Sequence, residues 1–178
     1  MTEFTETFTE PRKRDRVSQF NAVSIVAVPL AAILFQVYVP RFFTQLSYLE
    51  LPLLVTVYFA MMRRSPAAGV LFGMGVGLAQ DSLSPHPLGM FGIVKTLAGY
   101  FAASVSQRFN VESPLARLVL AFFFFFFHQF FYWVMARALL GQALDFDPRQ
   151  TLVLAVLNAA VAVPLYRILD KLKVTGDL

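Results

Sequence analysis

Cysteine is absent from the 178 residues of this chain, and it has only two histidines and one tryptophan. Without a thiol, the chain can form no disulfide, no thiolate metal site and no cysteine nucleophile. His86 and His128 alone do not make a metal site. Charged residues are also scarce, at 15% of the sequence, and the net charge of +4 is small. We relate that charge to orientation in a membrane, and we expect no nucleic acid partner.

Hydrophobic residues are abundant instead. They make up 57% of the sequence, with 20 phenylalanines, and the mean hydropathy is +0.62. Soluble domains are less apolar, so the composition predicts an all-α integral membrane protein. The first apolar run, 20–39, is long enough to span a bilayer and lacks a small-residue cleavage site. We interpret it as a retained helix and not as a signal peptide.

Six segments approach the roughly 20 residues that a transmembrane helix needs. They are 20–39, 46–62, 66–80, 88–107, 115–137 and 151–167. The connecting loops are too short to hold a soluble domain, and we find no internal repeat of the transporter type. The predicted organisation is a cytoplasmic tail (1–19), a six-helix transmembrane domain (20–170) and a second cytoplasmic tail (171–178).

The N-terminal tail is polar and repetitive, and it ends in a basic cluster within "TEFTETFTEPRKRDR". One interpretation is a disordered segment whose arginines fix the membrane topology. The other is a segment that binds a partner through Phe4 and Phe8.

Lysine and arginine are distributed unequally between the two sides of the predicted helices. With the N-terminus placed in the cytoplasm, eleven of the fifteen basic residues lie on the cytoplasmic side: Arg12, Lys13, Arg14, Arg16, Arg63, Arg64, Arg108, Arg117, Arg167, Lys171 and Lys173. The opposite side has Arg41, Arg137 and Arg149, and Lys95 lies within a span. This imbalance predicts that both termini are cytoplasmic, which requires an even number of spans.

Glycines recur at helical spacing in the third and fourth spans. Gly69, Gly73 and Gly77 follow one another at intervals of four residues, and Asp81 is the next step. Gly92 and Gly99 flank Lys95 on a similar small face of the fourth span. Small residues allow helices to approach closely in a bilayer, so we expect these five glycines to form a helix-packing or partner interface. A charge within hydrocarbon is costly unless it is paired, so we expect Lys95 to reach toward Asp81 near the outer surface.

The polar side chains of the spans fall mainly in the outer half of the predicted domain. We group five of them as an outer polar cluster: Glu50, Asp81, Lys95, His128 and Asn158. Either these groups satisfy one another and hold the helix bundle together, or they line an outward cavity or a groove for another protein's helix. Ser82, Ser84 and His86 lie near Asp81, but their spacing fits no nucleophile elbow. We expect no enzymatic activity and no cofactor.

The stretch "GLAQDSLS", followed by the turn Pro87-Leu88-Gly89 and an aromatic-rich fourth span, resembles the rod shape-determining protein MreD family of bacteria. The size, the six spans and the short loops are similar over almost the whole chain. The acidic-threonine tail is not a feature of that family, and Lys95 lies outside the matching motif.

The resemblance implies a non-enzymatic inner-membrane subunit of the cell-elongation complex that supports regulation of peptidoglycan synthesis and rod shape. Its expected partner is an MreC-like membrane protein, and through it RodA, a class B penicillin-binding protein and MreB, with membrane lipid around the helices. The resemblance leaves a homodimer open. MreD-like proteins are also similar in fold to the S components of energy-coupling-factor transporters, so the alternative function is a small-molecule-binding S component. The short outward loops and the position of Trp133, typical of an interfacial anchor, favour the elongation complex.

Overall fold

The computed structural model describes residues 20–85 and 87–174. Within those residues it has six α-helices and two short 3₁₀ helices. These are α1 (Ala22–Tyr38), η1 (Val39–Arg41), η2 (Thr44–Tyr48), α2 (Leu51–Arg63), α3 (Pro66–Leu83), α4 (Met90–Ser106), α5 (Pro114–Leu140) and α6 (Pro148–Asp170). The predicted all-α fold with six helices is therefore confirmed. The predicted N-terminal tail and the last four residues of the C-terminal tail lie outside the described residues.

Most helices begin where the local sequence offers a cap. An oxygen-bearing side chain accepts a hydrogen bond from a first-turn amide in four of the helices: Asn21 in α1, Ser65 in α3, Ser113 in α5 and Asp147 in α6. Proline follows the cap directly in the last three of these, where its missing N–H costs nothing. The loops are short because these start signals follow closely on the preceding helix ends.

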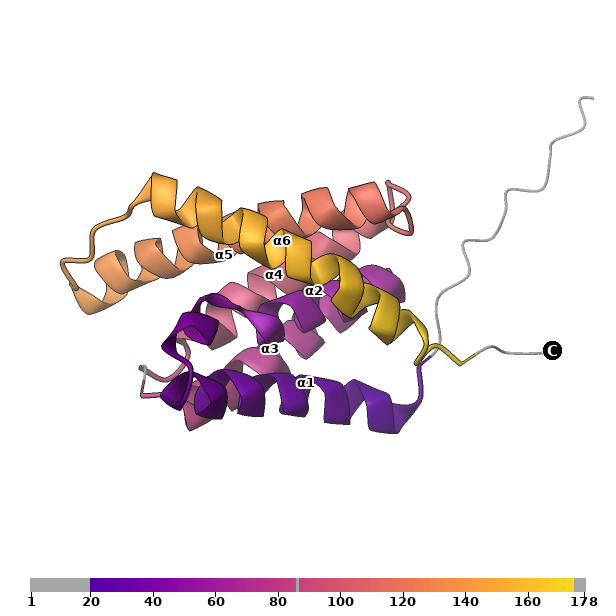
Figure 1. Ribbon diagram of the computed structural model, residues 1–178, viewed down its shortest axis with the longest axis horizontal. Coiled ribbons are helices and arrows are strands. Elements are labelled where there is room, and N and C mark those ends of the chain that lie inside the picture. Colours follow the sequence, from indigo (N-terminus) through magenta and orange to yellow (C-terminus); the bar gives the residue numbers. More distant parts are fainter. Residues whose placement is uncertain (1–19, 86, 175–178) are drawn as a thin grey trace, which may run out of the picture.

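Helix α2 lies at the centre of the molecule. Every residue from Pro52 to Met62 is buried, because α2 contacts all five other α-helices. Around it, α3 and α4 form an antiparallel hairpin with the most extensive contact of any helix pair, and α5 and α6 form a second hairpin. Helix α1 packs against α2 and, less extensively, against α3, so it lies on the opposite side of the bundle from α5 and α6 (Figure 1).

Four helical segments are long and apolar enough to cross a membrane: Ala22–Arg41, Thr44–Arg63, Pro114–Leu140 and Pro148–Asp170. Helix α4 is apolar but has only 17 residues. Helix α3 has 18 residues, and its glycines and its aspartate lower its hydropathy. At 1.5 Å per residue, both are about 26 Å long, slightly less than the roughly 30 Å of hydrocarbon. The chain is thus a multi-pass membrane protein, and spanning by α3 and α4 stays a prediction.

The two ends of the described chain meet at one end of the bundle. Phe20 and Lys173 form an isolated antiparallel backbone bridge, to the right in Figure 1. The Phe20 ring also packs edge-on against Tyr58 and Phe59 of α2, with centroids 6.0 and 4.9 Å away. The start of α1 and the segment after α6 are therefore held together beside the end of α2. We call this the inner end of the molecule, and the end with η2 and the α5–α6 loop the outer end.

Candidate functional site

The predicted glycine ridge of α3 lies inside the bundle, against α4. A Cβ atom at Gly69, Gly73 or Gly77 would overlap a backbone carbonyl oxygen of α4, that of Gly99, Lys95 or Phe91 respectively. A Cβ at Gly99 would overlap the carbonyl oxygen of Gly69 in turn. The two backbones are in direct contact along this seam, so its glycines serve internal packing and are not accessible to another protein.

Asp81 terminates this seam and caps the next helix. Its Oδ2 accepts hydrogen bonds from the backbone N–H groups of Gly89 and Gly92, both at 2.9 Å, and its Oδ1 accepts one from Phe91 at 3.0 Å. These amides lie at the start of α4, where the first N–H groups lack partners within the helix and the helix dipole favours an anion. Asp81 is only 1% exposed, so its charge is compensated inside the protein by these donors.

The Pro87-Leu88-Gly89 turn gives this cap its shape. Gly89 has φ 96°, in the left-handed region that favours glycine. At Gly92, a Cβ would lie 2.9 Å from Leu78 Cδ2 and 3.4 Å from the Asp81 carboxylate. The aspartate and the turn, which carried the resemblance in the sequence, are thus one structural unit that joins α3 to α4.

Lys95 is completely buried one turn further along α4. Its Nζ lies 3.2 Å from His128 Nε2 on α5 and 3.9 Å from Glu50 Oε2 at the start of α2. It also lies 4.4 Å from the ring centroid of Phe91, and that ring stacks on His128. One ammonium group therefore links α4 to α2 and α5.

The expected pairing of Lys95 with Asp81 is wrong. The carboxylate of Asp81 is directed at the backbone amides of α4, whereas Lys95 pairs with Glu50 and His128. The physical reason is that three amides at a helix start already satisfy the aspartate, while Glu50 and His128 otherwise have no cation nearby. Residue spacing placed Asp81 on the third span and Lys95 on the fourth. It could not reveal that the partners of Lys95 lie on α2 and α5.

Asn158 joins the same region from α6. Its Oδ1 accepts from the backbone N–H of Glu50 at 2.9 Å, and its Nδ2 donates to the carbonyls of Tyr48 at 2.8 Å and Leu154 at 3.0 Å. It is 0% exposed, and both hydrogens of its amide nitrogen and its oxygen take part in hydrogen bonds. The structure thus brings Glu50, Lys95 and His128 into direct contact, with Asp81 and Asn158 adjoining them through backbone groups.

The outer polar cluster is incompletely satisfied. Glu50 Oε2 and His128 Nδ1 are buried atoms that form no hydrogen bond with any described residue. Most of the Glu50 side chain is buried, with 12% exposed, and His128 is 1% exposed. A protonated Lys95 can only donate, so Nε2 of His128 accepts and Nδ1 keeps its hydrogen. The cluster therefore contains one buried acceptor and one buried donor without a hydrogen-bond partner among the described residues.

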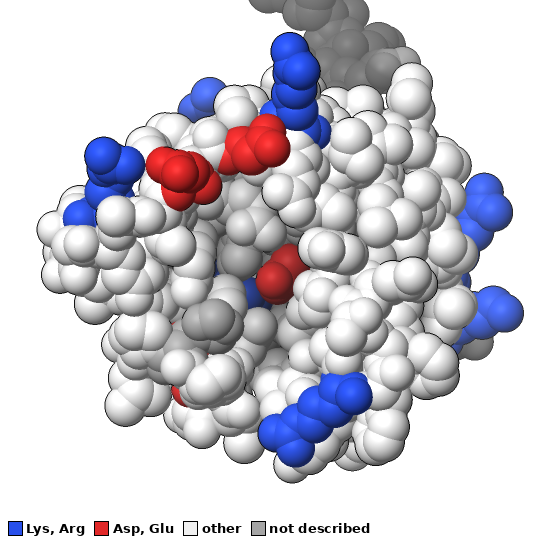
Figure 2. Space-filling view, turned by 60° about the vertical axis from the view of Figure 1, so that its left-hand side comes forward, with Lys and Arg blue, Asp and Glu red and all other residues white. Residues whose placement is uncertain are grey.

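The outer end of the molecule is hollowed. In Figure 2 the surface is largely uncharged, and a hollow near its centre contains both acidic and basic atoms. A cavity of about 260 Å³ lies where α5 and α6 approach the loop between them, and Tyr132, Trp133, Asp145 and Gln150 are among its lining residues. Tyr132 stacks on Phe91 with centroids 5.2 Å apart, so this cavity adjoins the cluster through the two rings.

A second polar site, missed by the sequence analysis, lies at the inner end. Arg117 of α5 donates through both terminal nitrogens to the Asp170 carboxylate of α6 and through Nε to the Val111 carbonyl, at 3.2 Å. The hydroxyl of Tyr58 on α2 donates to Asp170 at 2.8 Å, and Lys173 Nζ lies 2.9 Å away. The sequence analysis used Arg117 and Lys173 only to assign the orientation of the chain in the membrane. An acidic residue at the inner end of the sixth span, Asp170, was the signal that could have identified this second polar site.

Metal binding has no support in the described residues, which hold no group of three or more His, Asp or Glu side chains placed to bind an ion. The predicted loop histidine, His86, lies outside them.

The family model described as rod shape-determining protein MreD matches residues 17–173. No curated protein and no solved structure matches the chain. The expected likeness to S components therefore gains no support from a solved structure.

Proposed function

The chain belongs to the MreD family of rod shape-determining proteins, and from this we propose that it is a non-enzymatic subunit of the cell-elongation complex in the bacterial inner membrane. It would act there by binding an MreC-like membrane protein, and through that protein it would support the regulation of peptidoglycan synthesis by RodA and a class B penicillin-binding protein. MreB would lie on the cytoplasmic side. The family match over nearly the whole chain is the observation that carries the proposal.

The arrangement of the helices supports a binding role. The glycine seam and the two polar sites hold the bundle together as one body, and the connecting loops are short. We expect a protein with such a packed bundle and short loops to act by binding other proteins at its surface. The glycines are already in contact within the α3–α4 hairpin, so a partner helix must use another face. The outer polar cluster, in which the Glu50 side chain is 12% exposed and has one oxygen without a hydrogen-bond partner among the described residues, offers a polar contact to such a partner.

The proposed orientation places both termini in the cytoplasm. It is supported by the excess of basic residues on that side and by the bridge between Phe20 and Lys173, which brings the start of α1 and the end of α6 together. In this orientation the outer polar cluster faces the periplasm.

Co-purification tests the proposal. The chain, tagged at its C-terminus, is co-expressed with the MreC-like protein of the same bacterium and purified in a mild detergent. We expect a complex of fixed stoichiometry. Glu50→Gln removes the charged acceptor without changing the size of the side chain, and we expect it to lower the retained partner several-fold. Glu112→Gln, the same substitution at an exposed residue of the inner end, serves as the matched control and should retain the partner.

Two results would count against this proposal. Elution of the chain without its partner, while the folded yield is normal, would contradict MreC binding. Equal retention by the Glu50 and Glu112 variants would show that the partner does not use the outer polar cluster.

The outward hollow also favours a second candidate, the small-molecule-binding S component. Mass spectrometry of the chain purified alone distinguishes the two. A stoichiometric bound small molecule, together with no retention of the MreC-like protein, would replace the elongation proposal with this one.

A further inference from the structure

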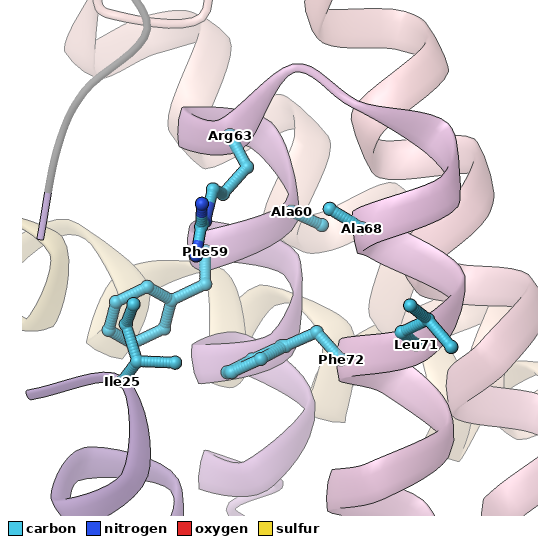
Figure 3. A pocket seen from close by; sticks show the side chains of 7 residues that line it. All are labelled: Ile25, Phe59, Ala60, Arg63, Ala68, Leu71 and Phe72. Atoms are coloured by element: carbon cyan, nitrogen blue, oxygen red, sulfur yellow. The ribbon is translucent and has the colours of Figure 1, made fainter. Parts of the chain in front are cut away.

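An apolar groove runs along the junction of α1 and α3, starting at the inner end. Its first part is a cavity of about 330 Å³ between α1, α2 and α3, shown in Figure 3. Its second part, of about 320 Å³, continues between α1 and α3 toward the middle of the bundle. Ile25, Leu71 and Phe72 line both parts, so the two form one continuous groove.

The length of the groove matches one leaflet of a bilayer. On α3 it extends from Ala68 to Ala79, which corresponds to about 16 Å at 1.5 Å per residue. Half of the hydrocarbon thickness of a membrane is about 15 Å. In the proposed topology, a groove of this length that begins at the inner headgroups ends near the bilayer centre.

A single charged residue stands at the inner mouth of the groove. Arg63, in the last turn of α2, is the one charged side chain among the described residues that line either part. Figure 3 shows its guanidinium folded back along α2 toward Phe59, at the edge of the cavity. It is exposed, and it forms no ion pair or hydrogen bond with another described residue. A guanidinium in this position is free to bind a phosphate.

The lining of the groove indicates the kind of occupant. Its residues are apolar except for Arg63 at the inner mouth, which matches a molecule with a long apolar part and one anionic end. An extended hydrocarbon chain is narrow enough to enter. The floor is open at Gly75, where an added Cβ would meet no heavy atom within 4 Å, and the walls are aliphatic and aromatic.

We propose that this groove is a binding site for one phospholipid of the inner leaflet with an anionic headgroup. One acyl chain lies between α1 and α3, and the headgroup phosphate binds Arg63. The assignment to the inner leaflet rests on the proposed topology. The bound chain would fasten α1, which buries only Pro29, Ala32 and Ile33 of its own, to the rest of the bundle.

The test uses the full chain, purified in detergent and depleted of lipid. Phosphatidylglycerol and phosphatidylcholine with identical acyl chains are added separately, and the bound lipid is counted by native mass spectrometry. We expect one tightly retained phosphatidylglycerol and weaker retention of phosphatidylcholine. Arg63→Gln should reduce the preference for phosphatidylglycerol about fivefold, as expected for one basic residue near an anionic headgroup. The control Arg108→Gln removes an exposed charge at the same end, outside the groove, and should leave the preference unchanged.

A second variant tests the acyl chain separately from the headgroup. Gly75→Leu fills the open floor of the groove, and we expect it to fold normally and to lose the retained lipid of either kind. Ala67→Leu adds similar bulk at an exposed position of α3 and should keep the lipid. Full retention by both Arg63→Gln and Gly75→Leu would overturn the proposal, and so would cross-linking of a co-expressed protein's helix to Leu71 in place of lipid. The lipid count is made without any MreC-like protein, so its outcome is independent of the complex proposed above.

Discussion

At the scale of single residues, three buried or half-buried carboxylates have different environments. Asp81 accepts three backbone hydrogen bonds at a helix start, and Asp170 is surrounded by Arg117, Lys173 and Tyr58. Glu50 has one cation 3.9 Å away and one oxygen without a hydrogen-bond partner among the described residues. The first two therefore stabilise the fold, whereas Glu50 retains the capacity to bind a further donor.

Replacement of the α4 cap should destabilise the protein. In Asp81→Asn, the amide nitrogen must face a backbone N–H that now has no acceptor, which costs about 1–3 kcal/mol. We expect a lower midpoint of thermal unfolding in detergent and a lower folded yield. Asp145→Asn, at an exposed residue of the outer end, should leave both unchanged. Equal midpoints for the two variants would mean that the cap contributes little.

Double-mutant cycles should identify Glu50 as the partner of Lys95. Lys95→Met leaves the Glu50 carboxylate buried without its cation, and adding Glu50→Gln should recover part of the lost stability, with a coupling of about 1–3 kcal/mol. Asp81→Asn should recover less of the Lys95→Met loss, since Asp81 keeps its amide donors. The quantity to measure is the unfolding midpoint of each single and double variant. A larger recovery with Asp81 would restore the pairing that the sequence suggested.

At the scale of elements, α3 shows how one helix can have a tightly packed face and an open one. Gly73 touches the backbone of α4, whereas Gly75 has no neighbour within 4 Å of an added Cβ. The two glycines are two positions apart in the sequence, which places them on different faces of the helix.

This contrast gives a matched pair of substitutions. Gly73→Ala must push α4 away, and we expect it to cost about 1–3 kcal/mol. Gly75→Ala meets no obstruction and should stabilise the helix by up to about 1 kcal/mol. The measurement is the midpoint of thermal unfolding of both variants in the same detergent. An equal loss of stability in the two variants would contradict the close contact between α3 and α4 at Gly73.

Hydrophobic periodicity was sufficient to predict the helices, because it depends on residues close in sequence. Small-residue spacing identified the glycines of α3 and α4 but left open whether they pack within the bundle or bind a partner. The predicted span 46–62 was too simple, since the structure has η2, a break at Glu50 and then α2. The pairings of Lys95 and Asp81 were beyond sequence reasoning, since they depend on which helices are neighbours in space. The outer polar cluster was grouped by predicted depth alone; the structure brings Glu50, Lys95 and His128 together, and these contacts were not predicted.

At the scale of the whole molecule, topology determines which site faces which compartment. The proposal places Gln45 and Gln142 outside and Glu112 and Leu172 inside, and all four are exposed. Single cysteines at these positions are the only thiols in the chain. We expect an impermeant maleimide to label the first two in intact spheroplasts and the last two only after lysis. Labelling of Glu112→Cys from outside would reverse the orientation.

The bridge between Phe20 and Lys173 has a consequence for how the chain can be re-engineered. A linker between these adjacent points closes only a short loop, and loop-closure entropy grows slowly with length. In such a closed chain, the order of the helices is determined by the position at which the new termini are introduced. A circular permutant that opens in the α2–α3 turn and starts at α3 would keep both new ends on the same side of the membrane as the old ones. Such a permutant should insert and fold, because each helix keeps its direction across the membrane and its neighbours in the bundle.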